Sequence, residues 1–350
     1  MRLVVNARFL TQEVTGVQRY ALELSKLLKK YYKDEIIFLS PKNIIQHEIA
    51  NKLDVLTIGT FKGHLWEQID LPYFLRQKKS PLLVNFANTA PLFYKNKIVT
   101  VHDIAYERFP KNFNWKFRLF YKILIPNIIK TSRHIITVSN FSKMEINDLY
   151  KARLDNISVV YNAVNKDFKP KQKDSKEKYI LAVSSLSYQK NFHSLIKAFN
   201  QLTNKKIKLF LVGSINRNFA NISLLNDIEN NKNIIFRGRV SDNELISLYS
   251  NAICFVTPSL YEGFGIPPLE AQTCGCPVIC SNAASLPEVC GDSVVYFNPY
   301  DIDDMSKKIE IVINDEKLQK ELVQKGFENI KRFSWKKSVD KLIKIIENLK

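Results

Sequence analysis

Short apolar runs, separated by helical patterns, recur along the whole chain, and no other feature limits its fold as strongly. Seven strand-like runs lie in the first half, at residues 3–5, 36–39, 55–58, 82–84, 98–101, 135–138 and 157–160. Six more lie in the second half, at residues 179–183, 207–212, 234–236, 253–256, 278–280 and 294–297. Strands that alternate with helices form parallel sheets with helices on both faces. The chain is therefore predicted to be an α/β protein with doubly wound, Rossmann-like sheets.

The alternation stops once, in a polar, lysine-rich stretch at residues 165–178 that has the character of a linker. A chain of 350 residues also exceeds the length that one hydrophobic core commonly serves, roughly 250–300 residues. We therefore expect two domains, residues 1–165 and residues 166–332. Two such domains place a ligand cleft between them, facing the carboxyl ends of both sheets.

One strand-to-helix crossover has the composition of a ligand-binding loop. Residues 259–270 follow the strand at 253–256, and Gly263 and Gly265 allow backbone amides to approach a ligand closely. Free amides and the positive end of the following helix favour a bound anion such as phosphate. Glu262 and Glu270 add carboxylates, which accept hydrogen bonds from hydroxyls. Amides for phosphate and carboxylates for hydroxyls suit a sugar nucleotide.

One histidine has the sequence setting of a site residue. His102 directly follows the strand at 98–101, so it is expected to face the ligand crevice at the carboxyl end of the sheet. The neighbouring Asp103 is expected to fix the tautomer of the ring or to raise its pKa. A structural role is the alternative for a lone histidine. The remaining histidines lack such a setting and are predicted to be surface or capping residues: His47, His64, His134 and His193.

Three further loops follow predicted strands. Lys190 lies with several hydroxyl side chains between a strand and a helix, where a lysine can hold a diphosphate and stabilise it as it departs. The alternative is a solvated loop lysine, one of many in this chain. Gly16 ends the loop after the first strand, and its backbone could contact phosphate or acceptor, although the dinucleotide fingerprint is absent. Arg239 and Val240 follow Gly238 and could present backbone groups to a base.

The chain is basic, and the charge is concentrated in its first half. The net charge is +18, and residues 1–165 carry 25 Lys and Arg against 13 Asp and Glu. This excess favours anionic lipid or nucleic acid as a partner, and biased codon usage is the alternative. Residues 108–143 contain eight Lys and Arg, no Asp or Glu, and several aromatic residues. This segment is either a membrane-interface helix or a core helix with solvated lysines, and Pro126 is expected to interrupt it.

Cysteine and aspartate patterns bear on disulfides and metals. All five cysteines lie within residues 254–290, and their odd number favours buried thiols in a reducing compartment. Asp301, Asp303 and Asp304 resemble a metal-binding acidic motif, but they are predicted to cap a helix, and no metal is expected. The amino terminus turns polar too early for a signal peptide, and no apolar run reaches membrane-spanning length. We therefore expect a cytoplasmic protein, peripheral to the inner face of the membrane if the basic helix binds lipid.

Together these motifs resemble the retaining glycosyltransferases of family four, which have the GT-B architecture of two Rossmann-like domains. The most specific part is Glu262, followed after seven residues by Glu270, within residues 261–271. Further matching segments lie at residues 15–19, 101–103, 138–142, 190–191, 236–241, 275–279, 286–289 and 333–335. The subgroup that looks most similar contains mannosyl- and rhamnosyltransferases of bacterial surface-polysaccharide assembly. By analogy, residues 333–350 form a helix that packs back on the first, acceptor-binding domain.

The resemblance implies a role for each matched residue. Glu270 would bind the ribose, and Glu262 with the amides of Phe264 and Gly265 would hold the hydroxyls of the donor sugar. Lys190 and the helix start at Ile266 would hold the diphosphate, and His102 would lie beside the anomeric carbon. Backbone groups of Arg239 and Val240 would contact the base. Ser185 stands where many relatives have an arginine, which leaves more of the diphosphate binding to Lys190 and the helix amides.

The activity implied by the resemblance is a retaining, metal-independent hexosyl transfer with no cofactor. The donor is a nucleoside diphosphate sugar, GDP-mannose by preference and a UDP-sugar second. The acceptor is a hydroxyl of a growing, lipid-linked bacterial surface glycan. A sugar-nucleotide epimerase of the same architecture is one alternative. A nucleic-acid-binding protein is the other, but no recognition motif supports it.

Overall fold

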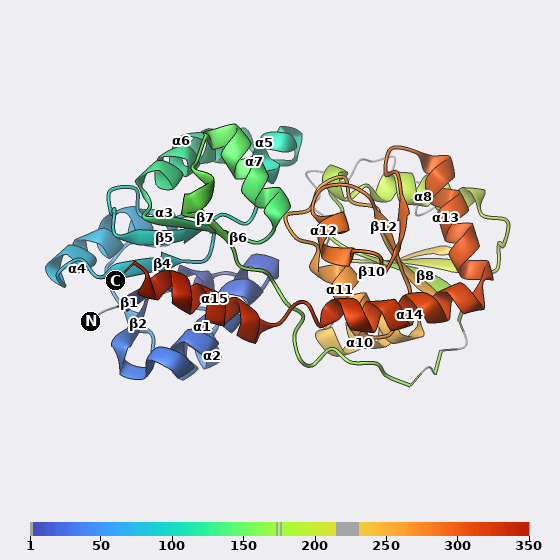
Figure 1. The fold of residues 1–350 in the computed structure, drawn as a ribbon, viewed down its shortest axis with the longest axis horizontal. Coiled ribbons are helices and arrows are strands. Elements are labelled where there is room, and N and C mark those ends of the chain that lie inside the picture. Colours follow the sequence, from blue (N-terminus) through green and yellow to red (C-terminus); the bar gives the residue numbers. More distant parts are fainter. Residues whose placement is uncertain (1–2, 173, 176, 215–230, 350) are drawn as a thin grey trace. The chain divides into compact units, whose positions relative to one another are not determined.

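The computed structural model describes residues 3–172, 174–175, 177–214 and 231–349, and the chain forms two compact units (Figure 1). Unit 1 comprises Met1–Arg108, Phe113–Asn162 and Ser334–Lys350. Unit 2 comprises Phe109–Asn112 and Ala163–Phe333. The sequence pattern gives no sign of the short excursion at Phe109–Asn112. The chain therefore passes from one unit to the other more than once.

Unit 1 contains a parallel sheet of seven strands in the order β3-β2-β1-β4-β5-β6-β7. Apart from β3, the strands are almost wholly buried, as expected when helices cover both faces of a parallel sheet. The strands are β1 (Leu3–Asn6), β2 (Ile36–Ser40), β3 (Leu56–Thr57), β4 (Leu82–Asn85), β5 (Lys97–Thr100), β6 (His134–Thr137) and β7 (Ile157–Val159). The covering helices include α1 (Gly16–Tyr32), α2 (His47–Lys52), α4 (Leu71–Gln77), α5 (Ala105–Arg108) and α7 (Asn140–Tyr150).

The last helix of the chain, α15 (Trp335–Glu347), packs on α1 in unit 1 (Figure 1). Its buried residues Val339, Leu342, Ile343 and Ile346 follow helical spacing, so one apolar face covers the neighbouring helix. Ser338 Oγ donates to the carbonyl of Tyr161 over 2.7 Å. This helix therefore completes the core of the unit that contains the start of the chain.

Helix α6 (Trp115–Thr131) runs through Pro126 without a break, so the expected interruption is wrong. A proline inside a helix removes one backbone hydrogen bond and costs about 3 kcal/mol. Here the surrounding turns bury four apolar side chains in the core of unit 1: Leu124, Ile125, Ile128 and Ile129. Burial of one large aliphatic side chain contributes about 1.5–3 kcal/mol, so packing of this face outweighs the lost hydrogen bond.

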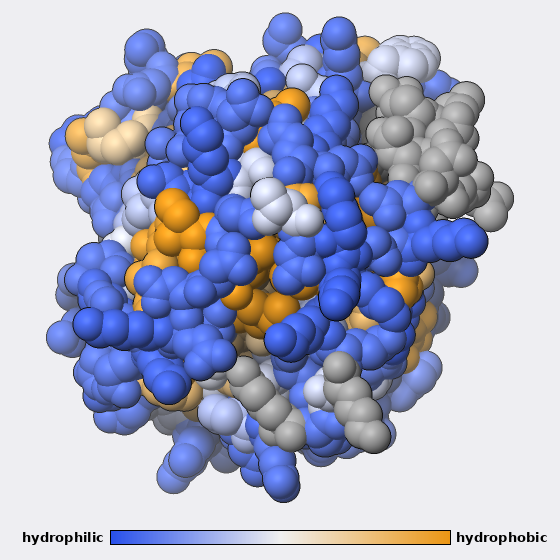
Figure 2. All heavy atoms as spheres, turned by 90° about the vertical axis from the view of Figure 1, so that its right-hand side faces the viewer, coloured by the Kyte–Doolittle hydropathy of each residue, from blue (hydrophilic) through white to orange (hydrophobic). Residues whose placement is uncertain are grey.

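Unit 2 contains a parallel sheet of six strands in the order β10-β9-β8-β11-β12-β13. The strands are β8 (Tyr179–Val183), β9 (Lys208–Val212), β10 (Ile234–Gly238), β11 (Cys254–Thr257), β12 (Val278–Ser281) and β13 (Val295–Phe297). The α-helices among the described residues of this unit are α8 (Phe192–Gln201), α10 (Asp242–Asn251), α11 (Ile266–Thr273), α12 (Leu286–Cys290), α13 (Ile302–Asn314) and α14 (Glu316–Ile330). Figure 2 shows a mainly hydrophilic face of this unit with apolar side chains gathered near its centre.

Two sequence expectations about unit 2 are confirmed by its geometry. Asp301 caps α13, because its Oδ1 accepts a hydrogen bond of 3.0 Å from the backbone N–H of Asp304. All five cysteines are free and buried. Burial raises the pKa of both the Cys254 and the Cys274 thiol to about 12, so these thiols stay protonated and unreactive at neutral pH.

Both sheets contain the strand order of the doubly wound fold, 3-2-1-4-5-6 when each is numbered from its own first strand, and the sheet of unit 1 adds a seventh strand after the sixth. The predicted fold class, an α/β protein with two Rossmann-like domains, is confirmed. In such sheets the strand order reverses at one point, and ligands bind outside the carboxyl ends of the strands there. The reversal lies between β1 and β4 in unit 1 and between β8 and β11 in unit 2.

Candidate active site

The loop after β11 turns sharply into α11, and Gly265 is the residue that permits the turn. Its φ of +94° is unfavourable for other residues, and a Cβ there would lie 2.7 Å from the Leu286 side chain. Prolines occupy the first turn of the helix, where their missing N–H groups cost nothing. Ile266 is the first residue of α11. The first turn of α11 therefore follows the strand at which the strand order of the unit 2 sheet reverses.

Lys190 and Glu262 form an ion pair at this loop. Lys190 Nζ lies 2.7 Å from Glu262 Oε1, and both side chains are largely buried. Ser259 Oγ donates to the same carboxylate oxygen over 2.8 Å. The pairing brings together two residues that the sequence analysis placed on different loops. A lysine side chain at this position can bind a phosphate that reaches the pair.

The two loops of the pair are also fixed through their backbones. The N–H of Leu260 donates to the carbonyl of Gln189 over 2.8 Å. Asn191 has the left-handed conformation, with φ of +56°, and its side chain donates to the carbonyl of Pro299. Ser285 Oγ lies 2.9 Å from the carbonyl of Glu262 and 2.9 Å from that of Phe264, so its proton is shared between two acceptors. Ser285 is a site residue that the sequence analysis missed, because an isolated serine carries no pattern.

Glu270 lies on α11, and its carboxylate is held from behind by a tyrosine. Tyr249 OH donates to Glu270 Oε2 over 3.2 Å. Burial, together with this carboxylate, raises the pKa of Tyr249 well above its ordinary value, so the hydroxyl remains a donor. The contact fixes the orientation of Glu270. Glu270 and Glu262 therefore have different partners and do not form an acid–base pair.

The other donor-side residues lie at the carboxyl edge of the same sheet. Ser185 is half-buried and lies two residues after β8. Gly213 comes so close to the neighbouring backbone that a Cβ at this position would lie 1.8 Å from the carbonyl oxygen of Ser184. Arg239 is exposed and Val240 half-buried directly after β10, which ends at Gly238 with φ of +69°. This edge of unit 2 also contains the remaining predicted donor-side residues: Lys190, Glu262, Phe264, Gly265, Ile266 and Glu270. The roles implied for these residues stay predictions.

Gly16 and His102 belong to unit 1. Gly16 is the exposed first residue of α1, where Thr15 and Gln18 form a capping box. His102 is buried, and its Nε2 donates to the carbonyl of Phe86 over 2.8 Å, which leaves Nδ1 as the acceptor of the neutral ring. Burial lowers the pKa of His102 below its ordinary value, and this effect outweighs the opposing effects of Phe86 and Asp103. The ring is therefore neutral at pH 7.

Of the two roles expected for Asp103, fixing the tautomer of His102 is wrong, whereas the charge of Asp103 does act to raise the pKa of the ring. Phe86, not Asp103, accepts the proton of the ring nitrogen and so fixes the tautomer. Asp103 Oδ1 instead accepts a hydrogen bond of 3.0 Å from the N–H of Ala105, at the start of α5. Its charge opposes the lowering of the His102 pKa but does not reverse it. The backbone N–H of His102 donates to Asn88 Oδ1 over 2.8 Å, so the loop after β4 holds both the ring and the backbone of this histidine.

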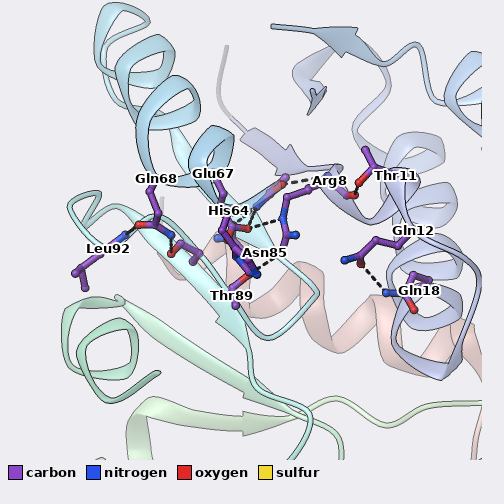
Figure 3. Close-up of polar contacts among 12 residues, drawn as sticks. Arg8, Thr11, Gln12, Gln18, His64, Glu67, Gln68, Asn85, Thr89 and Leu92 are labelled. Atoms are coloured by element: carbon purple, nitrogen blue, oxygen red, sulfur yellow. Dashed lines mark hydrogen bonds and ion pairs between the residues drawn. The ribbon is translucent and has the colours of Figure 1, made fainter. Parts of the chain in front are cut away.

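A buried ion pair lies at the reversal point of the unit 1 sheet, and the sequence analysis missed it (Figure 3). Arg8 Nε lies 3.2 Å from Glu67 Oε1, and Arg8 Nη2 donates to Thr89 Oγ1 over 2.8 Å. Asn6 Nδ2 donates to Glu67 Oε1 and to Asn85 Oδ1. Burial would raise the pKa of Glu67, but the neighbouring Arg8 and His64 outweigh it and lower the pKa to about 2.

His64 is not the plain surface or capping residue that was expected. Its Nδ1 lies 3.4 Å from Glu67 Oε2, and its ring packs against Phe120 and Tyr121 of α6. A π-helical turn, Trp66–Asp70, directs Glu67 toward Arg8. No sequence pattern gives such a turn in advance, because residues 63–77 have the composition of an ordinary helix.

Comparison with known proteins agrees with this architecture. Residues 163–329 match the family model "Glycosyl transferases group 1", and residues 14–168 match "Glycosyltransferase Family 4". The chain is 37% identical over 313 residues to O-antigen chain mannosyltransferase RfbU of Salmonella typhimurium, covering 85% of this chain and 87% of the relative. It is 29% identical to O-antigen chain mannosyltransferase B of Escherichia coli, with 96% of each covered.

Solved structures show the same fold at low sequence identity. Anabaena Alr3699/HepE, in complex with UDP and glucose, superposes with a TM-score of 0.77 at 17% identity over 99% of this chain and all of that one. WaaG, a glycosyltransferase of lipopolysaccharide biosynthesis, gives a TM-score of 0.75 at 14% identity, with 99% of each chain covered. Fold and site together define a glycosyltransferase of the GT-B class. The chain belongs to glycosyltransferase family 4.

Proposed function

We propose that this glycosyltransferase moves a hexose from a nucleoside diphosphate sugar to a hydroxyl of a growing, lipid-linked surface glycan. The observation that carries the proposal is the 37% identity to an O-antigen chain mannosyltransferase over 85% of the chain. GDP-mannose is the first donor on this ground. A UDP-sugar is the second, because the similar Anabaena protein is known in complex with UDP and glucose.

In the proposed reaction the bond between the anomeric carbon and the diphosphate oxygen breaks, and a bond to the acceptor oxygen forms on the same face. The acceptor proton passes to the leaving diphosphate, so the anomeric configuration is retained and no protein nucleophile is needed. Glu262 orients the sugar, and its pairing with Lys190 supports an orienting role. Lys190 and the amides at the start of α11 stabilise the departing charge in place of a metal ion.

The test combines binding and turnover. A thermal-shift panel of nucleoside diphosphate sugars should identify the donor, because a ligand that binds only the folded state raises the melting temperature. With that donor and a lipid-linked mannosyl acceptor, transfer should proceed in excess EDTA and give a product of retained configuration. Loss of transfer in EDTA would defeat the metal-free mechanism. An isomerised donor formed without acceptor would instead identify an epimerase.

Glu270→Ala is expected to weaken nucleoside diphosphate binding roughly tenfold or more, because a half-buried carboxylate that accepts hydrogen bonds from the ribose hydroxyls is lost. The measurement is isothermal titration calorimetry with the best diphosphate from the panel. Tyr249→Phe is the control, since it removes the support of Glu270 but keeps the carboxylate; it should have the smaller effect. An unchanged affinity in Glu270→Ala would rule out the ribose contact.

We also propose that unit 1 binds an anionic membrane surface through α6. The inner face of this helix is buried, while Leu119 and Ile123 are 54% and 59% exposed beside Lys116, Arg118 and Lys122. Exposed apolar side chains among cations are typical of a helix in the membrane interface. Among the described residues, no helix has the length and apolar character needed to cross a membrane.

Leu119→Ser combined with Ile123→Ser is expected to abolish most binding to phosphatidylglycerol vesicles in a sedimentation assay. Binding of the unchanged protein should weaken with added salt, because screening reduces the attraction of Lys and Arg to anionic lipid. Ile311→Ser is the matched control, as Ile311 is 50% exposed on α13 of unit 2. Equal binding by the double variant and the control would contradict the membrane role of α6.

A further inference from the structure

The chain crosses from unit 2 to unit 1 between two aromatic residues. Unit 2 ends at Phe333, and the last segment of unit 1 begins at Ser334. Ser334 caps α15, because its Oγ accepts a hydrogen bond of 3.2 Å from the N–H of Lys337, and Trp335 is the first residue of that helix. Residues 333–335 match the family motif, but the proposed reaction gives them no part. Each aromatic ring packs inside its own unit, and both rings lead to residues of the predicted site.

Phe333 packs on Phe264, which lies in the donor loop (residues 259–265). The ring centroids are 5.5 Å apart and the ring planes meet at 87°, so the edge of one ring faces the other. Both side chains are buried. Ser285 already fixes the backbone of Phe264 through its carbonyl. Phe333 therefore adds a hold on the side chain of a loop residue that lies between Glu262 and the start of α11.

The end of α14 fixes Phe333 in turn. The Arg332 guanidinium lies over the Phe333 ring, 4.9 Å from its centroid. Arg332 Nη2 donates to the carbonyl of Glu288 over 2.9 Å, and Nη1 donates to Asn329 Oδ1 over 2.7 Å. Asn329 Nδ2 donates to Gln272 Oε1 on α11 over 2.9 Å. The segment that carries Phe333 is therefore tied to α11, the helix that follows the donor loop.

Trp335 leads to His102 through one intervening ring. Its ring centroid lies 6.0 Å from that of Tyr20, and the Tyr20 centroid lies 5.0 Å from that of His102 at an interplanar angle of 80°. Tyr20 is fully buried, and its hydroxyl donates to the carbonyl of Val160 over 3.2 Å. Among the residues that the structure describes, the buried Trp335 Nε1 has no hydrogen-bond partner. Ring packing, rather than a hydrogen bond, therefore holds the indole against Tyr20.

We propose that Phe333 and Trp335 are positioning residues of the transferase: Phe333 holds the donor loop through Phe264, and Trp335 holds the His102 ring through Tyr20. The inference rests on the proposed function, in which the donor lies at this loop and the anomeric carbon lies beside His102. Neither residue is assigned a contact with substrate, and each acts through the ring next to it. One short segment of the chain thus orients a part of the site in each unit.

The role of Phe333 is tested by hydrogen exchange on the full chain without ligand. Phe333→Leu should speed exchange of the donor-loop amides roughly tenfold, because Phe264 loses the ring that holds it. Phe264→Leu removes the same contact from the other side, so the double variant should exchange little faster than either single variant. Phe199→Leu is the matched control, since it shortens a buried ring on α8 in the core of the same unit. It should leave the donor loop unchanged.

The role of Trp335 is tested by NMR of the His102 ring nitrogens, which report the tautomer of a neutral imidazole. Trp335→Leu should move these signals away from the form protonated at Nε2, because Tyr20 no longer holds the ring in its orientation toward Phe86. Trp335→Phe keeps an aromatic ring beside Tyr20 and should restore the signals. Leu75→Ala is the control, as it removes buried packing on α4 elsewhere in unit 1.

Nucleotide binding and turnover should separate the two residues. In calorimetric titrations with GDP and with UDP, Phe333→Leu should weaken the nucleotide that binds roughly tenfold, whereas Trp335→Leu should leave its affinity unchanged. In transfer assays, Phe333→Leu should raise the donor KM. Trp335→Leu should instead lower the turnover number roughly tenfold, because a displaced group beside the reacting carbon slows the chemical step. Trp335→Phe should recover most of the turnover.

The exchange and NMR measurements decide the inference without a donor. Faster exchange in Phe333→Leu and an altered tautomer in Trp335→Leu, with both controls unchanged, would support it. A variant that behaves like the unchanged protein, or no differently from its control, would overturn the role of that residue. Failure of the proposed function is a separate result, since it would appear as absence of GDP and UDP binding by the unchanged protein.

Discussion

Lys190→Ala should lower the turnover number of the transferase roughly 10²–10³-fold while nucleoside diphosphate affinity changes less than about tenfold. Removal of one preorganised group that stabilises developing charge has effects of this size on turnover. Binding depends less on Lys190, because the helix amides and Glu270 hold other parts of the nucleotide in the proposed site. The measurement is initial rate at saturating donor, together with calorimetric titration of the diphosphate. Full turnover in this variant would exclude the role in diphosphate departure.

The structure adds a second consequence to the loss of Lys190. Among the residues that the structure describes, the Glu262 side chain then keeps only Ser259 as a hydrogen-bond partner, so the carboxylate lies largely buried without a cation beside it. Lys190→Arg restores a cation with a different shape and should recover part of the activity. Lys197→Ala, an exposed lysine on the following helix, is the control and should have no effect. A loss of the same size in Lys197→Ala would mean that the assay reports general charge rather than the site.

Arg8→Met should destabilise unit 1 by about 3–5 kcal/mol, because it leaves the Glu67 carboxylate buried without its partner. All three tryptophans, Trp66, Trp115 and Trp335, belong to unit 1, so their fluorescence during urea unfolding reports on this unit. Adding Glu67→Gln to the same chain should recover most of the loss, since a neutral amide is cheaper to bury. No recovery in the double variant would show that Arg8 acts by packing alone.

The pH dependence of this pair has a defined sign. The folded-state pKa of Glu67 is about 2 against an ordinary value of 4.5, so its contribution to stability is present above pH 4.5 and is lost as the pH falls toward 2. The difference in unfolding free energy between the unchanged protein and Arg8→Met should therefore shrink in acid. Arg153→Met, at an exposed ion pair, should change neither stability nor its pH dependence. A difference that stays constant down to pH 2 would contradict the charge argument.

The fold could be predicted from the sequence because its signals are local and repeated. Each of the thirteen predicted strands corresponds to an observed strand, and even the short, exposed β3 falls within the predicted run at residues 55–58. Buried strands of a parallel sheet are continuous apolar runs, which a single sequence displays directly. Pro126 was misjudged because its effect depends on tertiary packing of the flanking turns, and a local rule does not include that contribution.

The donor-side loop was visible for a similar reason, since Glu262, Gly265 and Glu270 lie close together in one motif. The polar network of unit 1 could not be predicted from the sequence. Arg8, Glu67 and Thr89 come from three separated segments, and they meet only when β1 and β4 become neighbours in the sheet. Neighbours in the sequence can also fail to interact. Asp103 follows His102 directly and was expected to fix the tautomer of its ring, whereas the Asp103 carboxylate accepts a hydrogen bond from the N–H of Ala105.

The placement of α15 has a consequence for the order of events during synthesis. Domains generally fold in the order in which they leave the ribosome, the amino-terminal one first. Unit 1 contains the start of the chain, but its helix α1 stays uncovered until α15 (Trp335–Glu347) has been made. Unit 2, finished at Phe333, is therefore complete while the nascent first half still exposes an apolar helix face. The apolar face of α1 is therefore covered only after unit 2 has been made.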